Sequence, residues 1–358
     1  MKKVRYAVVG AGWISQEAFL PSIHATANSE VTAIVSGSAD VARKLADFHD
    51  IPNVYGYDDY DQMLADDVVD AVYIALPNSL HAEYTIRAAK AGKHALVEKP
   101  LAVSVEECQE MIRAAEDAGT LLMTAYRLHS EPGTVKVLDM IRSGAIGQPK
   151  FFVSTFSFQT ARGNHRLLAE HWGGPLQDIG VYCLNAARHC LAAEPSEVSA
   201  MKVHGDGDPR FTEVEGSMAV TMRFPGDRLG QFLISFESDD TDTYRVIGTT
   251  GEITVEQAYD FHFNPRIWLT NGRERHEIEV PDTDHFAGQA AYFSDCILTG
   301  TRPVPDGEEG LADVRALLAI EAAAKSGRTQ SVSTPERDRH PDQDCVRVLP
   351  RTERRLVL

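Results

Sequence analysis

The sequence predicts an α/β protein in two parts: a parallel sheet with helices on both faces, followed by an α+β part with a largely antiparallel sheet. Three observations support this fold class. The chain has 358 residues, a length that suits two domains. Strand and helix signals alternate over the first 125 residues, which is typical of a parallel sheet. After about residue 150, polar and apolar residues alternate along strands, which indicates a sheet covered on one face only.

The first part consists of short apolar runs that alternate with segments of helical spacing. The last of its helices starts with a capping box, because Ser104 is followed three residues later by Glu107, and Gly119 ends it. Apolar periodicity assigns the other segments. Strands are expected at 4–9, 31–35, 71–76, 95–97 and 121–125, and helices at 13–25, 41–48, 80–91 and 104–118.

The second part has more strands and fewer helices. Along 217–224, every second residue from Met218 to Phe224 is apolar, and the segment 225–227 reads Pro-Gly-Asp, which predicts a hairpin turn. Strands are expected at 151–158, 198–204, 214–224 and 229–237, and helices at 176–191, 285–299 and 308–325. The resulting domains are 1–126 and 127–330, with a polar, poorly ordered tail at 331–358.

The composition argues against several classes of function. Hydrophobic residues make up 43% and charged residues 24% of the chain, which is ordinary for a globular protein. Lys and Arg number 35 against 52 Asp and Glu, a net charge of −17, which disfavours binding to nucleic acid or to anionic lipid. No apolar run is long enough to cross a membrane, and no signal peptide precedes the first strand, so we expect a cytoplasmic protein.

Cysteine and histidine give no metal or disulfide pattern. The five cysteines are scattered without a C-x-x-C pair, which fits a reducing compartment. The 13 histidines include no H-E-x-x-H, and His165 and His171 are six residues apart, on different faces of a helix. We therefore expect no bound metal.

A glycine-rich turn follows the first predicted strand. Gly10 permits a tight turn, and Gly12 lets the backbone approach a pyrophosphate at the N-terminus of the next helix. Ser15 occupies the third position of the G-x-G-x-x-G pattern, so an ordinary strand–helix turn is the alternative. Because the turn opens a β-α-β unit, the sequence predicts a Rossmann domain that binds a dinucleotide.

The end of the second strand favours NADP over NAD. An NAD site needs Asp or Glu there for the ribose hydroxyls, whereas this chain has Ser36-Gly37-Ser38. Arg43 and Lys44 follow on the next helix. Small hydroxyl groups and a nearby cation suit a 2′-phosphate, although the two cations are also consistent with a solvated helix face. NADP is the expected cofactor, with NAD as the alternative.

Polar residues follow two further strands of the first part. Asn78 and His81 come after 71–76, and Glu98 and Lys99 come after 95–97. Ligands of doubly wound sheets bind at the carboxyl ends of strands. A lysine there can place a fixed positive charge beside a reacting hydroxyl; the alternative for Lys99 is a surface salt bridge with Glu98.

The second part contributes an acid and a phenol on one helix. Asp178 and Tyr182 are four residues apart after the run Gly173-Gly174, so they share a helical face. Such a pair can orient a sugar and move a proton. An acid in the first turn of a helix is also favoured by the helix dipole alone.

Together these segments resemble the glucose–fructose oxidoreductase, inositol dehydrogenase and rhizopine-catabolism (GFO/IDH/MocA) oxidoreductase family. Within it, the motifs are most like those of glucose–fructose oxidoreductases and NADP-dependent aldose (xylose) dehydrogenases. The likeness covers about residues 3–330. The segments that carry it are 78–83, 98–100, 125–129, 176–185, 210–215 and 306–310.

The resemblance implies roles for individual residues. Lys99 is expected beside the nicotinamide, Asp178 is expected to position the substrate, and Tyr182 is expected to transfer the proton. Ser38 and Arg43 join the cofactor site on the argument for a 2′-phosphate given above. The resemblance places the following residues around the cofactor: Gly10, Gly12, Trp13, Ile14, Ser36, Gly37, Leu76, Asn78, His81, Glu98, Lys99 and Arg127. It also implies a C-terminal α/β domain with an open mixed sheet, and a homodimer or homotetramer formed through that sheet.

The sequence is therefore interpreted as an NADP-dependent oxidoreductase that converts an aldose or related polyol, with an aldose giving a lactone. Alternatives are a glucose–fructose oxidoreductase with tightly held NADP, a trans-dihydrodiol dehydrogenase, an anhydrofructose-type reductase, and a non-catalytic NADP-binding regulator. Without the N-terminal arm of glucose–fructose oxidoreductase, the cofactor is expected to exchange. His165 stands where relatives have Trp, and Trp172 where Gly is common, which implies a different substrate pocket.

Overall fold

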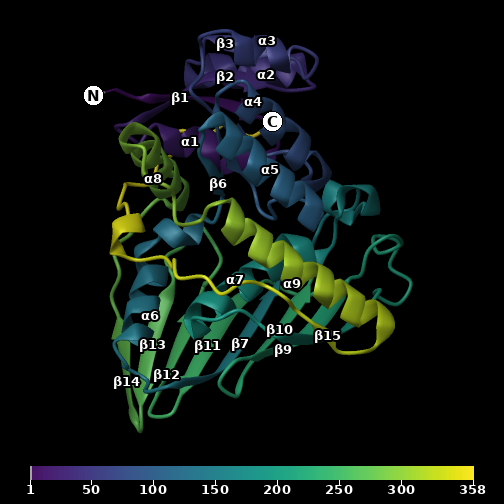
Figure 1. Ribbon diagram of the computed structural model, residues 1–358, viewed down its shortest axis with the longest axis vertical. Helices are drawn as coiled ribbons and strands as arrows, with labels where there is room; N and C mark the ends of the chain where they lie inside the picture. Colours follow the sequence, from purple (N-terminus) through teal and green to yellow (C-terminus); the bar gives the residue numbers. More distant parts are fainter. Residues whose placement is uncertain (1) are drawn as a thin grey trace. The chain divides into compact units, whose positions relative to one another are not determined.

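The computed structural model describes residues 2–358, which form two compact units (Figure 1). Both units are discontinuous in sequence, whereas the sequence analysis divides the chain linearly after residues 126 and 330. Unit 1 consists of Met1–Glu131, Asp282–Gly310 and Cys345–Leu358, and unit 2 of Pro132–Pro281 and Leu311–Asp344.

Unit 1 contains a parallel six-stranded sheet in the order β3-β2-β1-β4-β5-β6. This is the strand order of a dinucleotide-binding doubly wound fold, so the predicted Rossmann domain is confirmed. Strand β4 is buried along its whole length, as the continuous apolar run Ala71–Ile74 requires. The strands are β1 (Val4–Val9), β2 (Ser29–Val35), β3 (Asn53–Tyr55), β4 (Ala71–Ile74), β5 (His94–Val97) and β6 (Leu122–Thr124).

The helices of unit 1 mostly follow the predicted periodicity. Ser104 accepts a hydrogen bond from the Glu107 amide at 3.1 Å, as the capping box predicts, and Gly119 ends the helix with φ +65°. The helices are η1 (Ser15–Phe19), α1 (Leu20–Ile23), α2 (Ala39–His49), α3 (Tyr60–Ala65), η2 (Asn78–Leu80), α4 (His81–Lys90), α5 (Val105–Ala118), η3 (Arg127–Ser130) and α8 (His285–Thr299).

Helix α8 corrects one prediction, because the sequence analysis places it in the second domain. It belongs to unit 1, where Ser294 bonds to the Tyr6 hydroxyl at 2.9 Å. Asn28 also donates to the carboxylate of Asp295 at 2.7 Å. Because these tertiary hydrogen bonds join residues more than 260 positions apart, helical periodicity alone could not reveal them.

Unit 2 is built on a nine-stranded sheet in the order β14-β13-β12-β11-β7-β10-β9-β8-β15. The pairing of β7 with β10 is parallel and the other pairings are antiparallel, so the predicted open mixed sheet is confirmed. Strand β9 begins at Ser217, three residues later than predicted. The strands are β7 (Pro149–Ser157), β8 (Glu197–Val203), β9 (Ser217–Phe224), β10 (Arg228–Ser235), β11 (Thr241–Gly248), β12 (Glu252–Glu256), β13 (Arg266–Asn271), β14 (Glu274–Ile278) and β15 (Gln330–Ser331).

Helix α7 and the preceding turn η6 pack on one face of this sheet, against β7 and β10. Phe152 and Phe232 are buried on this face, whereas Phe151 and Leu233 are 47% and 50% exposed. The alternation predicted along 217–224 is confirmed, because every second residue of β9 from Met218 to Phe224 is buried. The helical segments are α6 (Pro132–Arg142), η4 (His165–Leu167), η5 (Ala169–His171), η6 (Leu176–Gly180), α7 (Val181–Leu191), η7 (Gln343–Cys345) and α9 (Gly307–Ser326), which belongs to unit 2 from Leu311 onward.

The segment 345–358 is more ordered than predicted, since it packs on unit 1. The Leu349 carbonyl accepts a hydrogen bond from the Asp284 amide at 2.8 Å, and Arg354 pairs with Asp50 at 2.7 Å. The five cysteines all lie within residues 2–358, where they are buried and form no disulfide. No helix within residues 2–358 is long and apolar enough to cross a membrane.

Candidate cofactor and catalytic site

The turn after β1 requires glycine at its first position. Gly10 has φ +99°, and a Cβ there would lie 2.5 Å from the carbonyl oxygen of Ala75. A Cβ on Gly12 would meet nothing within 4 Å, so the backbone is open to a ligand at that point. Ser15 donates its hydroxyl to the Gly10 carbonyl oxygen at 2.6 Å. A side-chain hydrogen bond thus closes the turn in this chain, where the standard motif has a third glycine.

The residues after the turn are accessible to a cofactor. Trp13 is 48% exposed and Ile14 is half-buried, immediately before η1. The first N–H groups of a helix lack intrahelical partners and attract phosphate. The donor set and the open space at Gly12 therefore fit a pyrophosphate.

The end of β2 presents the residues predicted to select the cofactor. Ser36 accepts a hydrogen bond from the Ser38 amide at 3.2 Å, and Ser38 caps α2 by accepting from the Val41 amide. Arg43 lies on the exposed surface of α2 and pairs with Asp40 at 3.7 Å. The N-terminus of α2 and Arg43 both supply positive charge, which suits an anionic group.

His81 lies behind the predicted cofactor site and not on its surface. Its side chain is fully buried, and its two ring nitrogens lie 2.9 Å from the carbonyl oxygens of Leu76 and Pro100. Burial lowers the pKa of His81. His81 therefore connects the segment after β4 to the segment after β5, whereas Asn78 is half-buried.

Glu98 and Lys99 follow β5 and are both partly exposed. The Tyr73 hydroxyl donates to Glu98 at 2.6 Å. Burial raises the pKa of Glu98, against the opposing positive charges of Lys99 and Arg127. Lys99 is thus a cation close to an acid whose protonated form is favoured by burial.

Arg127 is buried, whereas a residue that touches a cofactor directly is expected to be accessible. It is 3% exposed and donates to Nδ1 of His285 at 2.9 Å. Burial, and then the charge of Arg127, lowers the pKa of His285. Arg127 therefore joins η3 to the start of α8 and contributes positive charge near Glu98 from below the surface.

In unit 2, Asp178 is held by an arginine that the sequence analysis did not select. Arg166 Nε lies 2.9 Å from a carboxylate oxygen of Asp178, and the Asp178 amide donates to the Gly174 carbonyl oxygen at 3.2 Å. The backbone oxygen of Arg166 also accepts from the Gly174 amide at 2.8 Å. One residue thus fixes both the diglycine turn and the carboxylate.

Tyr182 lies one helical turn beyond Asp178, on α7, and is half-buried. Its ring packs against Phe156, at a centroid distance of 6.0 Å, and against Tyr259, at 5.9 Å. Tyr259 is itself fixed by a hydrogen bond of 2.7 Å between its hydroxyl and the Ser154 hydroxyl. Sequence reasoning missed Tyr259, because only tertiary structure brings it to α7.

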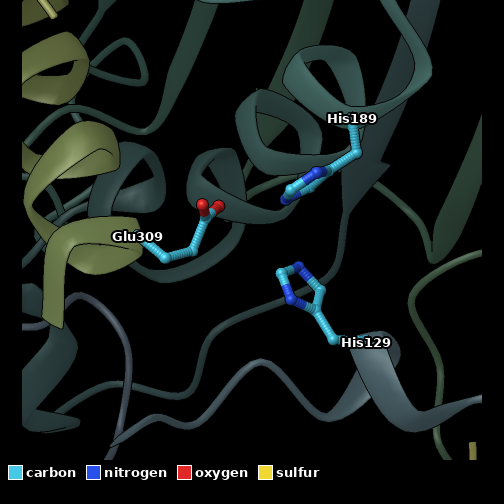
Figure 2. A group of neighbouring side chains, drawn as sticks. All are labelled: His129, His189 and Glu309. Carbon is cyan, nitrogen blue, oxygen red and sulfur yellow. The ribbon is translucent and has the colours of Figure 1, made fainter. Parts of the chain in front are cut away.

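Figure 2 shows two buried side chains of unit 1 that are of metal-ligand type: His129 of η3 and Glu309 in the first turn of α9. A ring nitrogen of His129 and a carboxylate oxygen of Glu309 lie within 4.8 Å of each other. The figure also draws His189, which belongs to α7 of unit 2. A structural metal site needs about four ligands, so this pair does not define one, and the expected absence of a metal stays a prediction.

Comparisons with known proteins identify the family. Residues 4–126 match the model of an oxidoreductase family with an NAD-binding Rossmann fold, GFO/IDH/MocA, and residues 134–254 match the C-terminal domain of the same family. The chain belongs to the GFO/IDH/MocA oxidoreductase family, which confirms the predicted resemblance and the prediction of an oxidoreductase.

Particular relatives are similar over nearly their whole length. A D-xylose 1-dehydrogenase [NADP(+)] of Haloarcula marismortui is 30% identical over 91% of this chain and 92% of its own. The crystal structure of an aldose-aldose oxidoreductase from Caulobacter crescentus is 33% identical, with a TM-score of 0.89 over 92% of this chain and 100% of its own. The crystal structure of an Actinomadura kijaniata 3-ketoreductase in complex with NADP and TDP-benzene is 29% identical, with a TM-score of 0.83 over 90% of this chain and 98% of its own.

Proposed function

We propose that the protein is an NADP-dependent oxidoreductase that transfers a hydride between the nicotinamide and an aldose or related polyol. The observation that carries this proposal is the spacing of two side chains. Asp178 is held by Arg166 at 2.9 Å, and Tyr182 follows it one helical turn later. A carboxylate and a phenol at this spacing can hold a sugar hydroxyl and take its proton. The printed activities of the xylose dehydrogenase and the aldose-aldose oxidoreductase support the same class of substrate.

The predicted cofactor residues have separate tasks in this proposal. The open backbone at Gly12 and the following helix N-terminus bind the pyrophosphate, and Ser36 and Arg43 face the 2′-phosphate. NADP supplies the hydride acceptor when bound. His81 acts through the backbone of Leu76 and Pro100, and Arg127 acts through its contact with His285.

Proton transfer is the task of Tyr182. A free tyrosine has a pKa of about 10 and is a poor base at neutral pH. A cation favours the phenolate of such a group, and we propose that Lys99 supplies positive charge on the nicotinamide side of the reaction. Asp178 orients the sugar by accepting from its hydroxyl groups, while Arg166 holds its carboxylate in place.

The test is a screen of purified protein against a panel of aldoses and polyols with NADP, following the absorbance of NADPH. We expect oxidation of at least one aldose and a lactone as product. NADP binding without turnover of any substrate, in either direction, would support the non-catalytic regulator instead.

A second candidate is the coupled oxidation and reduction of two sugars on a retained cofactor. The similarity to the aldose-aldose oxidoreductase of Caulobacter crescentus favours it. In this case dialysed protein would keep stoichiometric nucleotide and convert a mixture of sugars without added NADP. An exchanging cofactor, as the sequence analysis expects, requires added NADP after dialysis.

We also propose that residues 127–330 form a homodimer or homotetramer through the open face of the sheet of unit 2, and that the protein acts in the cytoplasm. The open face carries exposed apolar side chains on β7, β8 and β10, and apolar patches of this kind mark interaction sites. They are Phe151, Val153, Met201, Val203, Leu229 and Leu233. Light scattering of the native protein and of Leu233→Glu tests the assembly, since a buried charge there should give monomers.

A further inference from the structure

Glu321 of α9 lies in unit 2, and neither the motifs nor the proposed reaction accounts for it. Its Oε1 accepts a hydrogen bond from Nε1 of Trp172 at 2.9 Å and a second one from Nε2 of Gln177. These two donors stand on either side of the diglycine turn Gly173-Gly174. A single carboxylate oxygen therefore joins the chain before the turn to the chain after it.

The turn has a backbone that needs such support. Trp172 adopts φ 52°, a left-handed conformation that is unfavourable for a residue with a side chain. A Cβ on Gly173 would lie 2.4 Å from the carbonyl oxygen of Arg166, and Gly174 has φ +123°. The indole bond to Glu321 offsets part of the unfavourable conformation of Trp172, because a strained residue persists only when surrounding contacts hold it.

The same contacts lead directly to the reacting groups. Gln177 is 1% exposed and immediately precedes Asp178, whose amide bonds to the Gly174 carbonyl oxygen. Fixing Gln177 therefore fixes the start of the helical segment that carries Asp178 and, one turn later, Tyr182. We propose that Glu321 is a positioning residue, which sets the orientation of this helix by holding Trp172 and Gln177. The proposal rests on the proposed function, since the reacting groups are those named there.

Other charged groups around Glu321 determine how it responds to pH. Glu215 is 6% exposed and pairs with Lys202 at 3.2 Å. Burial raises the pKa of Glu321, the neighbouring Glu215 raises it further, and the bonds from Trp172 and Gln177 and the charge of Lys202 lower it. Protonation of Glu321 therefore begins at a higher pH than for an ordinary glutamate, and the protonated acid is a weaker acceptor.

The experiment compares Glu321→Ala, Glu321→Gln and Trp172→Phe with the native enzyme on the sugar found by the screen. We expect Glu321→Ala to lower kcat roughly 10- to 100-fold through misplacement of the reacting groups, with the KM for NADP within about twofold. Glu321→Gln keeps an acceptor oxygen, so its kcat should stay within a few-fold, and the fall of kcat at acidic pH that Glu321 causes should disappear. Trp172→Phe loses one of the two hydrogen bonds to Glu321, so its kcat should lie between those of Glu321→Ala and Glu321→Gln.

Matched controls are Glu274→Ala and Trp268→Phe, which alter an exposed glutamate of β14 and an indole of β13 in the same unit. Both should leave kcat within about twofold of native. Circular dichroism at the assay temperature shows whether each variant is folded. A kcat of Glu321→Ala within twofold of native, or equal losses in the Ala and Gln variants with an unchanged pH profile, would overturn the positioning role.

A second measurement does not depend on turnover. The chain has three tryptophans, so the indole Nε1–H signal of Trp172 can be assigned by its loss in Trp172→Phe. In Glu321→Ala this proton should lose the downfield position of a charge-assisted bond and exchange faster with solvent. An unchanged signal refutes the contact even if the native protein oxidises no sugar, so failure of this inference and failure of the proposed function are distinguishable.

Discussion

Replacing Tyr182 by Phe removes one phenolic oxygen and keeps a ring of the same shape. The ring packs against Phe156 and Tyr259 at centroid distances of 6.0 Å and 5.9 Å, and a phenylalanine retains both contacts. The variant therefore separates two roles of Tyr182. As a proton-transfer group it acts through its oxygen, and as a packing residue it acts through its ring.

The two roles predict effects of very different size. Loss of a positioned general base lowers the rate by roughly 10² to 10⁴, and a 100-fold loss corresponds to about 2.7 kcal/mol of activation free energy. Loss of a hydroxyl that serves only the fold costs about 0.5–1.5 kcal/mol of unfolding free energy. We expect Tyr182→Phe to lower kcat by at least about 10² while leaving NADP affinity and thermal stability near native.

The assay measures steady-state sugar oxidation at saturating NADP, together with thermal unfolding. Tyr259→Phe is the matched control, because it removes a buried hydroxyl bonded to Ser154 at 2.7 Å. It should cost about 1 kcal/mol of stability and change kcat only a few-fold. If Tyr182→Phe oxidises sugar within a few-fold of native, the catalytic role is wrong, and the role of Asp178 loses its support.

Three other perturbations have outcomes fixed by charge. Ser36→Asp should reverse the preference for NADP over NAD, because a carboxylate repels the 2′-phosphate and accepts from a ribose hydroxyl. Calorimetry with both nucleotides measures the two affinities. Equal affinities of the native protein for NADP and NAD would contradict the predicted preference. Arg188 pairs with the largely buried Glu194 at 2.6 Å and with the fully buried Asp313 at 2.7 Å. Arg188→Met leaves both acids without this cation, and denaturant unfolding should show a loss of about 3–5 kcal/mol. Burial lowers the pKa of His49 from 6.5 to about 4, so the unfolded chain binds the extra proton between these values. Stability should therefore fall by up to about 3 kcal/mol as the pH drops through this window, and His49→Phe should flatten the profile.

Much of unit 1 could be predicted because its elements are regular. Apolar runs such as Ala71–Ile74 are buried on both faces, and the helices between them have caps that are local in sequence, as at Ser104. The strand β3 (Asn53–Tyr55) was missed because three residues show no periodicity. Strand β14 (Glu274–Ile278) was missed because nearly all its residues are exposed and polar.

Candidate site residues could be predicted from motifs, but the extent to which each side chain is buried could not. His81 follows a strand that ends at the cofactor edge, yet its side chain is fully buried and lies against two carbonyl oxygens. Arg127 is likewise buried against His285. A motif records which residues occur together near a site, whereas burial depends on the packing of segments such as α8 that come from distant parts of the chain.

The partners of Asp178 were beyond sequence reasoning for the same reason, but one departure from the family pattern contained a clue. Trp172 stands where glycine is common, and its left-handed backbone is a conformation that glycine adopts far more readily than other residues do. Keeping a tryptophan there is unfavourable unless its side chain gains a contact that glycine cannot make. The bond from Trp172 to Glu321, which spans 149 residues, is such a contact. Trp172, which the sequence analysis interprets as a sign of a changed pocket, thus gives Glu321 of α9 a contact beside the diglycine turn. Together with the bond to Gln177, this contact supports the start of the segment that carries Asp178.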